Sequence, residues 1–307
     1  MSDVLNYAKD GNFEKLEKLL NEGKEPNVQD EKYGYTPLHL ACFNDHEGCA
    51  TLLLDHGANV EIQDQIGNTP LHWACRFGLE GCVTLLLDHG ANVEETRKYG
   101  WTPLQWACEN GHEECATLLL DHGANMEIQD NDGITPLHWT YEKSHEGILT
   151  LLLDRGANLE EKSMYGWTPL QWACINGHEG ILTLLLDHGA NMEIQDENGT
   201  TPLQWACYNG HEGCVTLLLD HGANMEIQNE DGMTPLLLAC FKGHEGCVNL
   251  LLDHGANVEI QNEDGDIPLH LAYENGHEGC VTLLLDHEAN MEIQNEDRWT
   301  NMEIQDK

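Results

Sequence analysis

Short apolar runs recur along this chain with a period of 33 residues, and each period holds two of them. In both runs the apolar residues fall three or four positions apart, which is the spacing of one helical face. Thr69 and Pro70 precede the first run of one period, and this pair is typical of a helix start. Gly78 follows the first run and Gly90 the second, where a left-handed residue commonly ends a helix. The pattern predicts two short helices in every period.

This repeat occurs eight times without a change of register, between residues 31 and 297. A single helix pair of this size cannot bury its apolar face, so the core has to form between stacked repeats. The sequence therefore predicts an all-α solenoid, a curved rod of helix pairs joined by hairpin or turn tips. The repeats open with Thr36, Thr69, Thr102, Thr135, Thr168, Thr201 and Thr234, while Ile267 holds the eighth place and Thr300 the ninth.

The two ends of the chain depart from the repeat. Residues 1–30 lack the Thr-Pro pair but keep two amphipathic stretches, which predict an N-terminal capping helix pair. Residues 298–307 are interpreted as a truncated ninth repeat and a C-terminal tail. Glu288 replaces the glycine of the other repeats, so we expect this end of the stack to open first. The predicted apolar faces of the N-terminal pair are Leu5 and Ala8, and Phe13, Leu16, Leu19 and Leu20.

Several short motifs accompany the period. Residues 69–72 read Thr-Pro-Leu-His, residues 111–112 read Gly-His, residues 85–87 are leucines, and residues 90–92 read Gly-Ala-Asn. This series resembles the ankyrin repeat, and the resemblance covers about nine-tenths of the chain. It implies a β-turn and two antiparallel helices per repeat, with variable hairpin tips that often contact partners.

The formal net charge is −40, from 54 acidic and 14 basic residues, and three rows of one residue per repeat carry much of it. No basic stripe is available to a phosphate backbone, so the charge disfavours nucleic-acid binding. We interpret the rows as a solvated surface in preference to a docking face. They are Glu47, Glu80, Glu113, Glu146, Glu179, Glu212, Glu245 and Glu278; Asp55, Asp88, Asp121, Asp154, Asp187, Asp220, Asp253 and Asp286; and Glu61, Glu94, Glu127, Glu160, Glu193, Glu226, Glu259 and Glu292, at a hairpin position.

Twelve cysteines occupy two recurring helix positions that the apolar pattern places in the core. Thiols of successive repeats would be about 10 Å apart, which is too far for a disulfide. The cysteines therefore predict buried, reduced thiols and a reducing compartment. The sequence has neither a membrane-spanning apolar stretch nor a secretion signal. We expect a cytoplasmic protein, with the nucleus as the alternative, and not a secreted one.

Histidine–cysteine pairs three residues apart, such as His46 and Cys49, raise the question of metal or thiol chemistry. A structural zinc ion needs four converging ligands, but the pairs of successive repeats would lie about 10 Å apart. A nucleophilic thiol needs an electropositive and partly exposed setting, whereas these thiols are predicted to be buried among carboxylates. We expect no metal, no cofactor and no catalytic residue.

The hairpin tips differ between repeats, and repeats 1, 3 and 5 carry aromatic tips built on a Tyr-Gly pair. No core position is available to these side chains, and exposed tyrosine and tryptophan anchor many interfaces. They predict partner contacts; the alternative is that a two-repeat duplication copied them without a binding role. The first-helix tryptophans Trp73, Trp106, Trp139, Trp172 and Trp205 are instead interpreted as core between repeats. The predicted partner-binding residues are Tyr33, Tyr35, Phe43, Arg76, Phe77, Tyr99, Trp101, Tyr165, Trp167 and Tyr208.

A ridged stack without an enclosed cavity favours the binding of another macromolecule over catalysis. We expect a non-enzymatic module that binds a partner protein, through a basic and apolar segment, on its concave hairpin and first-helix face. We expect a monomer that neither binds nucleic acid nor inserts into a membrane. One alternative is an adaptor that recruits substrates, for example to a ubiquitin ligase. Another is an acidic scaffold or spacer that binds basic segments diffusely.

Overall fold

The computed structural model describes residues 2–163 and 165–287. These residues form eighteen α-helices and no strand, which confirms the predicted all-α solenoid of helix pairs. They fall into two compact units, one that ends at Asn158 and one that begins at Leu159. Glu288 and the truncated ninth repeat, 298–307, lie outside the described residues.

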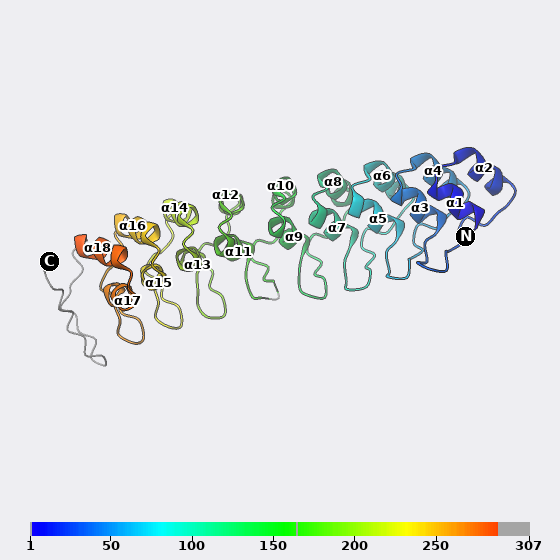
Figure 1. The fold of residues 1–307 in the computed structure, drawn as a ribbon. Coiled ribbons are helices and arrows are strands. Elements are labelled where there is room, and N and C mark those ends of the chain that lie inside the picture. The colour runs from blue at the N-terminus through cyan, green and yellow to red at the C-terminus, as the bar shows by residue number, and fades with distance from the viewer. Residues whose placement is uncertain (1, 164, 288–307) are drawn as a thin grey trace. The chain divides into compact units, whose positions relative to one another are not determined.

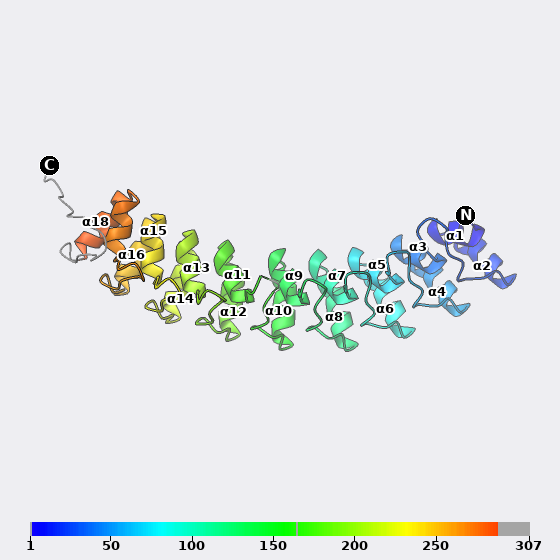
Figure 2. The same ribbon diagram turned by 90° about the horizontal axis from the view of Figure 1, so that it is seen from below.

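Within the first unit the helices form two layers (Figure 1). First helices pack against first helices and second helices against second helices of the neighbouring repeats. The hairpin tips project from the layer of first helices (Figures 1 and 2). The first helices are α1 (Asp3–Lys9), α3 (Pro37–Phe43), α5 (Pro70–Phe77), α7 (Pro103–Asn110) and α9 (Pro136–Glu142); the second helices are α2 (Phe13–Asn21), α4 (Glu47–Asp55), α6 (Glu80–Asp88), α8 (Glu113–Asp121) and α10 (Glu146–Asp154).

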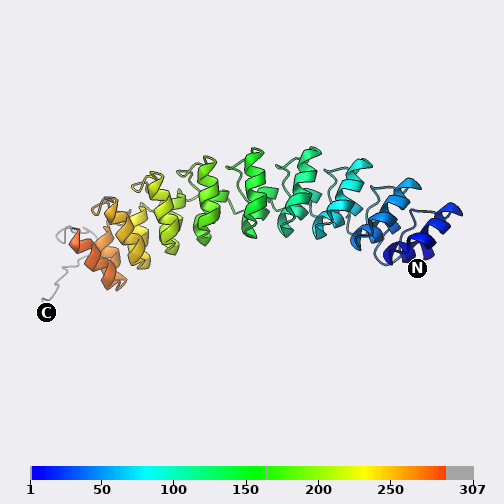
Figure 3. The same cartoon turned by 90° about the horizontal axis from the view of Figure 1, so that it is seen from above.

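The second unit repeats this arrangement, with first helices packed on first helices and second helices on second helices. Figure 3 shows its helix pairs following one another side by side. The first helices are α11 (Pro169–Asn176), α13 (Pro202–Asn209), α15 (Pro235–Lys242) and α17 (Pro268–Glu274); the second helices are α12 (Glu179–Asp187), α14 (Glu212–Asp220), α16 (Glu245–Asp253) and α18 (Glu278–Asp286).

The residues that the sequence pattern marks as helix starts and helix ends do begin and end these helices. Pro70 is the first residue of α5, where its missing N–H would have no partner anyway. Gly78 closes the same helix in the left-handed region, with φ of 68°. Leu71 on α5 and Val83 on α6 are completely or almost completely buried, as their spacing predicts. The core of each unit thus lies between the two helix layers and between neighbouring repeats.

The N-terminal pair, α1 and α2, caps the first unit and packs against α3 and α4. Leu5, Ala8, Leu16 and Leu20 are buried as predicted. The assignment of Phe13 to the apolar face was wrong, because this residue opens α2 and its side chain is 43% exposed.

Candidate functional site

In repeats 1 and 2 the Thr-Pro-Leu-His segment fixes the first helix to the hairpin of the next repeat. In repeat 1 the Thr36 N–H donates to His39 Nδ1 at 3.1 Å. The other ring nitrogen, Nε2, lies 3.0 Å from the backbone oxygen of Asn68 and therefore carries the proton. His39 is buried, and burial lowers its pKa, so the neutral ring is favoured. The histidine thus bridges two consecutive repeats through its two nitrogens.

Glutamine replaces this histidine in repeats 3, 5 and 6 and makes the same bridge. Gln105 Oε1 accepts the Thr102 N–H at 2.8 Å, and Gln105 Nε2 donates to the backbone oxygen of Ile134 at 2.9 Å. A side-chain amide offers an acceptor and a donor in fixed positions, as a neutral imidazole does. Histidine and glutamine are therefore structurally interchangeable here.

An aspartate holds the hairpin of repeat 2 internally, and backbone bonds join neighbouring hairpins of the first unit. Asp64 Oδ1 accepts the N–H groups of Ile66 and Asn68, at 2.9 and 2.8 Å, inside the hairpin of repeat 2. Between hairpins, the Lys98 N–H donates to the Ile66 oxygen and the Asn131 N–H donates to the Tyr99 oxygen. These bonds order the tips of the first unit before any ligand is present.

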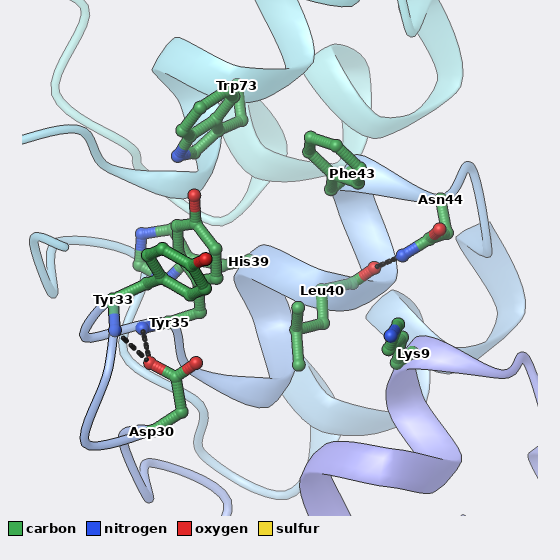
Figure 4. Close-up of a pocket in the computed structure, with 9 residues that line it drawn as sticks. All are labelled: Lys9, Asp30, Tyr33, Tyr35, His39, Leu40, Phe43, Asn44 and Trp73. Carbon is green, nitrogen blue, oxygen red and sulfur yellow. Dashed lines mark hydrogen bonds between the residues drawn. The ribbon is translucent and has the colours of Figure 1, made fainter.

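Aromatic side chains of repeats 1 and 2 surround a pocket of about 190 Å³ (Figure 4). The Tyr33 and Tyr35 rings are stacked, with centroids 5.4 Å apart. Asp30 Oδ1 accepts the backbone N–H groups of both residues. Trp73 lies edge-on to Tyr35 at 5.9 Å and to Phe43 at 5.6 Å. Four of the predicted contact residues therefore converge: Tyr33, Tyr35 and Phe43 line this pocket, and Phe77 packs on Phe43 with centroids 5.0 Å apart.

The aromatic tip of repeat 3 contradicts part of the prediction. Tyr99 is 57% exposed, as expected, but Trp101 is half-buried. The Trp101 ring centroid lies 4.6 Å from those of both Trp106 and Trp139, so this residue does fill space between repeats. Trp139 in turn is only half-buried, and so are Trp172 and Trp205. The first-helix tryptophans therefore form a border between the core and the hairpins, where the tips pack on them, and not a fully buried row.

Tyr99 has an unusual backbone conformation, with φ of 80°. A bulky residue in the left-handed region is strained, at a cost of order 1–3 kcal/mol. Its neighbours hold it there, because its carbonyl oxygen accepts the Asn131 N–H at 3.0 Å. The bond to the next hairpin thus holds an exposed tyrosine at the tip against this backbone strain.

The second unit has its own, smaller aromatic group. Tyr165 is 66% exposed, and its ring lies 5.7 Å from that of Trp167, which is half-buried. Trp205 meets Trp167 edge-on at 5.9 Å and also meets Tyr208, over whose ring Lys242 places its ammonium group. The predicted contacts Tyr165, Trp167 and Tyr208 are thus linked through one first-helix tryptophan.

The third acidic row has a structural role that the sequence did not reveal. Glu61 Oε1 accepts the backbone N–H of Asn92 at 2.7 Å, and Glu193 Oε1 accepts that of Asn224 at 2.7 Å. The same bond joins the four pairs Glu94–Asn125, Glu127–Asn158, Glu160–Asn191 and Glu226–Asn257. These carboxylates thus link each repeat to the next one, and we call them inter-repeat clasps. The other two rows are exposed wherever the structure describes them, which agrees with a solvated surface.

The histidines of the Gly-His motif bond to backbone rather than to cysteine. His112 Nε2 lies 3.1 Å from the Arg76 oxygen and His211 Nε2 lies 3.0 Å from the Ile175 oxygen, each in the preceding repeat. All twelve cysteines are buried free thiols, and burial raises the pKa of Cys115 and of Cys214 to about 12. Within 2–163 and 165–287, no three metal-binding side chains converge.

The stack, its capping histidines and its tied hairpins can now be set beside known proteins. A family model described as "Ankyrin repeats (3 copies)" matches residues 5–97, 90–163, 157–229 and 221–297. The chain belongs to the ankyrin-repeat family. The stacked pairs α3–α4 to α17–α18 are thus ankyrin repeats, and the Thr-Pro-Leu-His bridges link their first helices to the hairpins.

Two curated proteins share part of these ankyrin repeats. Potassium channel AKT2/3 of Arabidopsis thaliana is 38% identical over 63 residues, which are 20% of this chain and 8% of the channel. Ankyrin repeat-containing protein P1E11.10 of Schizosaccharomyces pombe is 38% identical over 58 residues, 19% of this chain and 28% of that protein. The matched segments therefore cover well under a third of either relative.

Among the described residues, each helix is too short or too polar to traverse a bilayer.

Proposed function

We propose that this ankyrin-repeat chain is a non-enzymatic module that binds a partner protein on its hairpin and first-helix face. The observation that carries the proposal is the exposure of large aromatic side chains on hairpins that are already ordered. Tyr33, Tyr99 and Tyr165 are all exposed at hairpin tips, and Tyr99 is held there against backbone strain. Side chains of this kind contribute much of the affinity in protein interfaces.

Preorganisation supports the same face. In repeat 1 Asp30 accepts the backbone N–H groups of Tyr33 and Tyr35, and in repeat 3 the Tyr99 oxygen accepts the Asn131 N–H of the next hairpin, so little conformational entropy remains to be lost when a partner docks at these two tips. Phe43 and Phe77 extend the aromatic surface from the tips onto α3 and α5. A partner segment that is apolar towards these rings, and basic towards the exposed acidic second helices, would complement both surfaces.

The proposal can be tested with single tip variants and a matched control. A partner is first captured from the native cell, and its affinity is then measured with purified proteins. Tyr99→Asn removes the ring and retains a residue that tolerates the left-handed region. We use it in place of a double change with Trp101, because Trp101 also packs on Trp106 and Trp139. Tyr33→Ala tests the first repeat.

Each tip variant should weaken binding by at least about 2 kcal/mol if its tyrosine is a hot spot. Phe13→Ala is the control, because Phe13 is an exposed aromatic residue in the other helix layer. An affinity that survives the loss of both tyrosines, or that falls equally with Phe13→Ala, would refute this binding face. Mapping of the partner onto the second helices alone, with no contact to the hairpins or first helices, would refute it as well.

A further inference from the structure

Arg76 and Arg97 stand out on the hairpin and first-helix face of the first unit. The Arg76 guanidinium carbon lies 5.3 Å from the ring centroid of Trp73 and 4.5 Å from that of Trp106. Arg97 lies 5.0 Å from the centroid of Trp101 and 4.6 Å from that of Trp106. Both guanidinium groups are thus positioned by the same tryptophan, Trp106, and both arginines are half-buried. Stacking on aromatic rings fixes a guanidinium while leaving its N–H edge free to donate.

Neither arginine forms an ion pair among the described residues, although the chain carries 54 carboxylates. By comparison, Arg155 on the second-helix side pairs with Asp121 at 2.8 Å. The carboxylates whose charge acts on Arg97 are Glu109 and Asp64, and Lys143, Arg76 and Arg97 act in turn on Glu109.

The two neighbouring carboxylates are poorly placed to satisfy the arginines. Asp64 already accepts the Trp73 indole N–H at 3.0 Å, together with the backbone N–H groups of its own hairpin. Glu109 forms no ion pair with either arginine, and burial raises its pKa. Arg97 Nε is thus left without an acceptor among the described residues.

Repeat 3 differs from repeats 2 and 6 in the residue that faces the first-helix tryptophan. In repeats 2 and 6 the first-helix tryptophan donates its indole N–H to a hairpin aspartate, Trp73 to Asp64 and Trp205 to Asp196, both at 3.0 Å. Arg97 occupies the aspartate position in repeat 3. Trp106 Nε1 and Arg97 Nε are buried without an acceptor; Trp139 Nε1 in repeat 4 is too, although Asp130 holds the aspartate position there. The repeat has lost a carboxylate and gained donors, and unsatisfied buried donors are costly.

We propose that Arg76 and Arg97 together bind the carboxylate of a glutamate or aspartate side chain of the partner protein. Guanidinium groups form charge-assisted hydrogen bonds with carboxylates, and aromatic rings around them exclude water from such bonds. Tyr99, Phe77 and the tryptophan rings would contact apolar residues on either side of that acidic residue. The inference rests on the proposed function, because it names the chemistry of one contact on the same face.

The site can be probed without the natural partner. The probe is the peptide acetyl-Leu-Glu-Leu-amide, titrated into the full-length protein at constant ionic strength. The N–H resonances of Trp106 Nε1 and Arg97 Nε, followed by NMR, report on the site directly. The matched peptide acetyl-Leu-Gln-Leu-amide has the same shape but no charge.

We expect the glutamate peptide to shift both resonances saturably, and the glutamine peptide to bind on the order of tenfold more weakly or not at all. Arg76→Gln and Arg97→Gln should each abolish the difference between the peptides. Arg155→Gln makes the same charge change in the other helix layer and should leave it intact. The NMR spectrum of each variant establishes that its fold is retained, and Arg76→Gln tests the site if Arg97→Gln does not fold.

Equal binding of the two peptides, absence of saturable shifts, or an equal loss in Arg155→Gln would each overturn the inference. A phosphoserine peptide that binds far more tightly than the glutamate peptide would assign the site to phosphorylated partners and overturn the choice of carboxylate. None of these outcomes affects the tyrosine variants, so the proposed binding face can fail or hold independently.

Discussion

Replacement of His72 by glutamine should remove a specific part of the protein's sensitivity to acid. His72 is buried in the first-helix bridge of repeat 2, where its Nδ1 accepts the Thr69 N–H and its Nε2 lies 3.2 Å from the Trp101 oxygen. Burial lowers its pKa from 6.5 to about 4. The unfolded chain therefore takes up a proton at His72 more readily than the folded chain does. The contribution of this group is complete above pH 6.5 and is lost as the pH falls from 6.5 to about 4.

The size of the effect follows from these two pKa values. Protonation of the unfolded chain at pH 5 lowers the free energy of unfolding by about 2 kcal/mol relative to pH 7, and the full loss below pH 4 is about 3 kcal/mol. Glutamine retains the bridge, as Gln105 and Gln204 do in their repeats, and cannot be protonated. His72→Gln should thus lose about 2 kcal/mol less than the wild type between pH 7 and pH 5.

Urea unfolding followed by tryptophan fluorescence gives the free energy of unfolding of both proteins at pH 7 and at pH 5. The quantity compared is the stability that each protein loses between the two pH values. His138 has a similarly lowered pKa of about 4, but it is present in both proteins and cancels. The control is His89→Gln, which removes an exposed imidazole at the end of α6 and should reproduce the wild-type pH dependence. If His72→Gln loses as much stability as the wild type between the two pH values, the neutral bridging histidine is an incorrect description.

Three further predictions concern stability: two concern glycine substitutions and one concerns salt. Gly213→Ala should raise the free energy of unfolding by about 0.5–1 kcal/mol, because Gly213 lies in the first turn of α14 and the atoms nearest to its added Cβ belong to the movable carboxylate of exposed Glu179. Gly210→Ala should lower the free energy of unfolding by about 1 kcal/mol or more, because Gly210 has φ of 76° and its added Cβ would lie 2.6 Å from His244 Nδ1. Urea unfolding that shows a change of the same sign in both glycine variants would contradict this reasoning. Salt should raise the melting temperature between very low and physiological ionic strength, because the exposed acidic rows repel one another; an unchanged or lower value in a thermal scan would show that this repulsion is negligible.

The sequence predicted the elements whose causes are local. Thr69, Pro70 and Gly78 act within a few residues of their own helix, so the helix bounds could be read directly. The repetition then implied that equivalent helices stack, because each pair leaves an apolar face to be covered. Burial of the cysteines followed from the same periodicity.

The remaining features depend on distances between atoms of neighbouring repeats, and the 33-residue period of the sequence does not reveal these distances. The Glu61 clasp needs a backbone N–H of the next hairpin at hydrogen-bonding distance, and the pattern of acidic rows is identical whether or not that bond exists. Trp101 occupies a tip position by sequence but is covered because two first-helix tryptophans reach it. A signal for the arginine site was available: Arg97 interrupts the aspartate position of repeats 2, 4 and 6. The significance of that replacement depends on the bond from Trp73 to Asp64, which the sequence alone does not show.

The charge of the chain therefore has to be considered surface by surface. The exposed first and second acidic rows lie on the second helices, and the third row is largely committed to clasps between repeats. Most of the basic residues within the described repeats lie instead on hairpins or first helices, and several of them stack on aromatic rings. Salt screens charges beyond about 8 Å at physiological ionic strength, so a docked segment experiences its nearest groups more than the net charge of −40. For the partner proposed above, the acidic rows would speed the approach of its basic residues, while the contacts on the aromatic face, including that of an acidic residue with Arg76 and Arg97, would decide how tightly it is held.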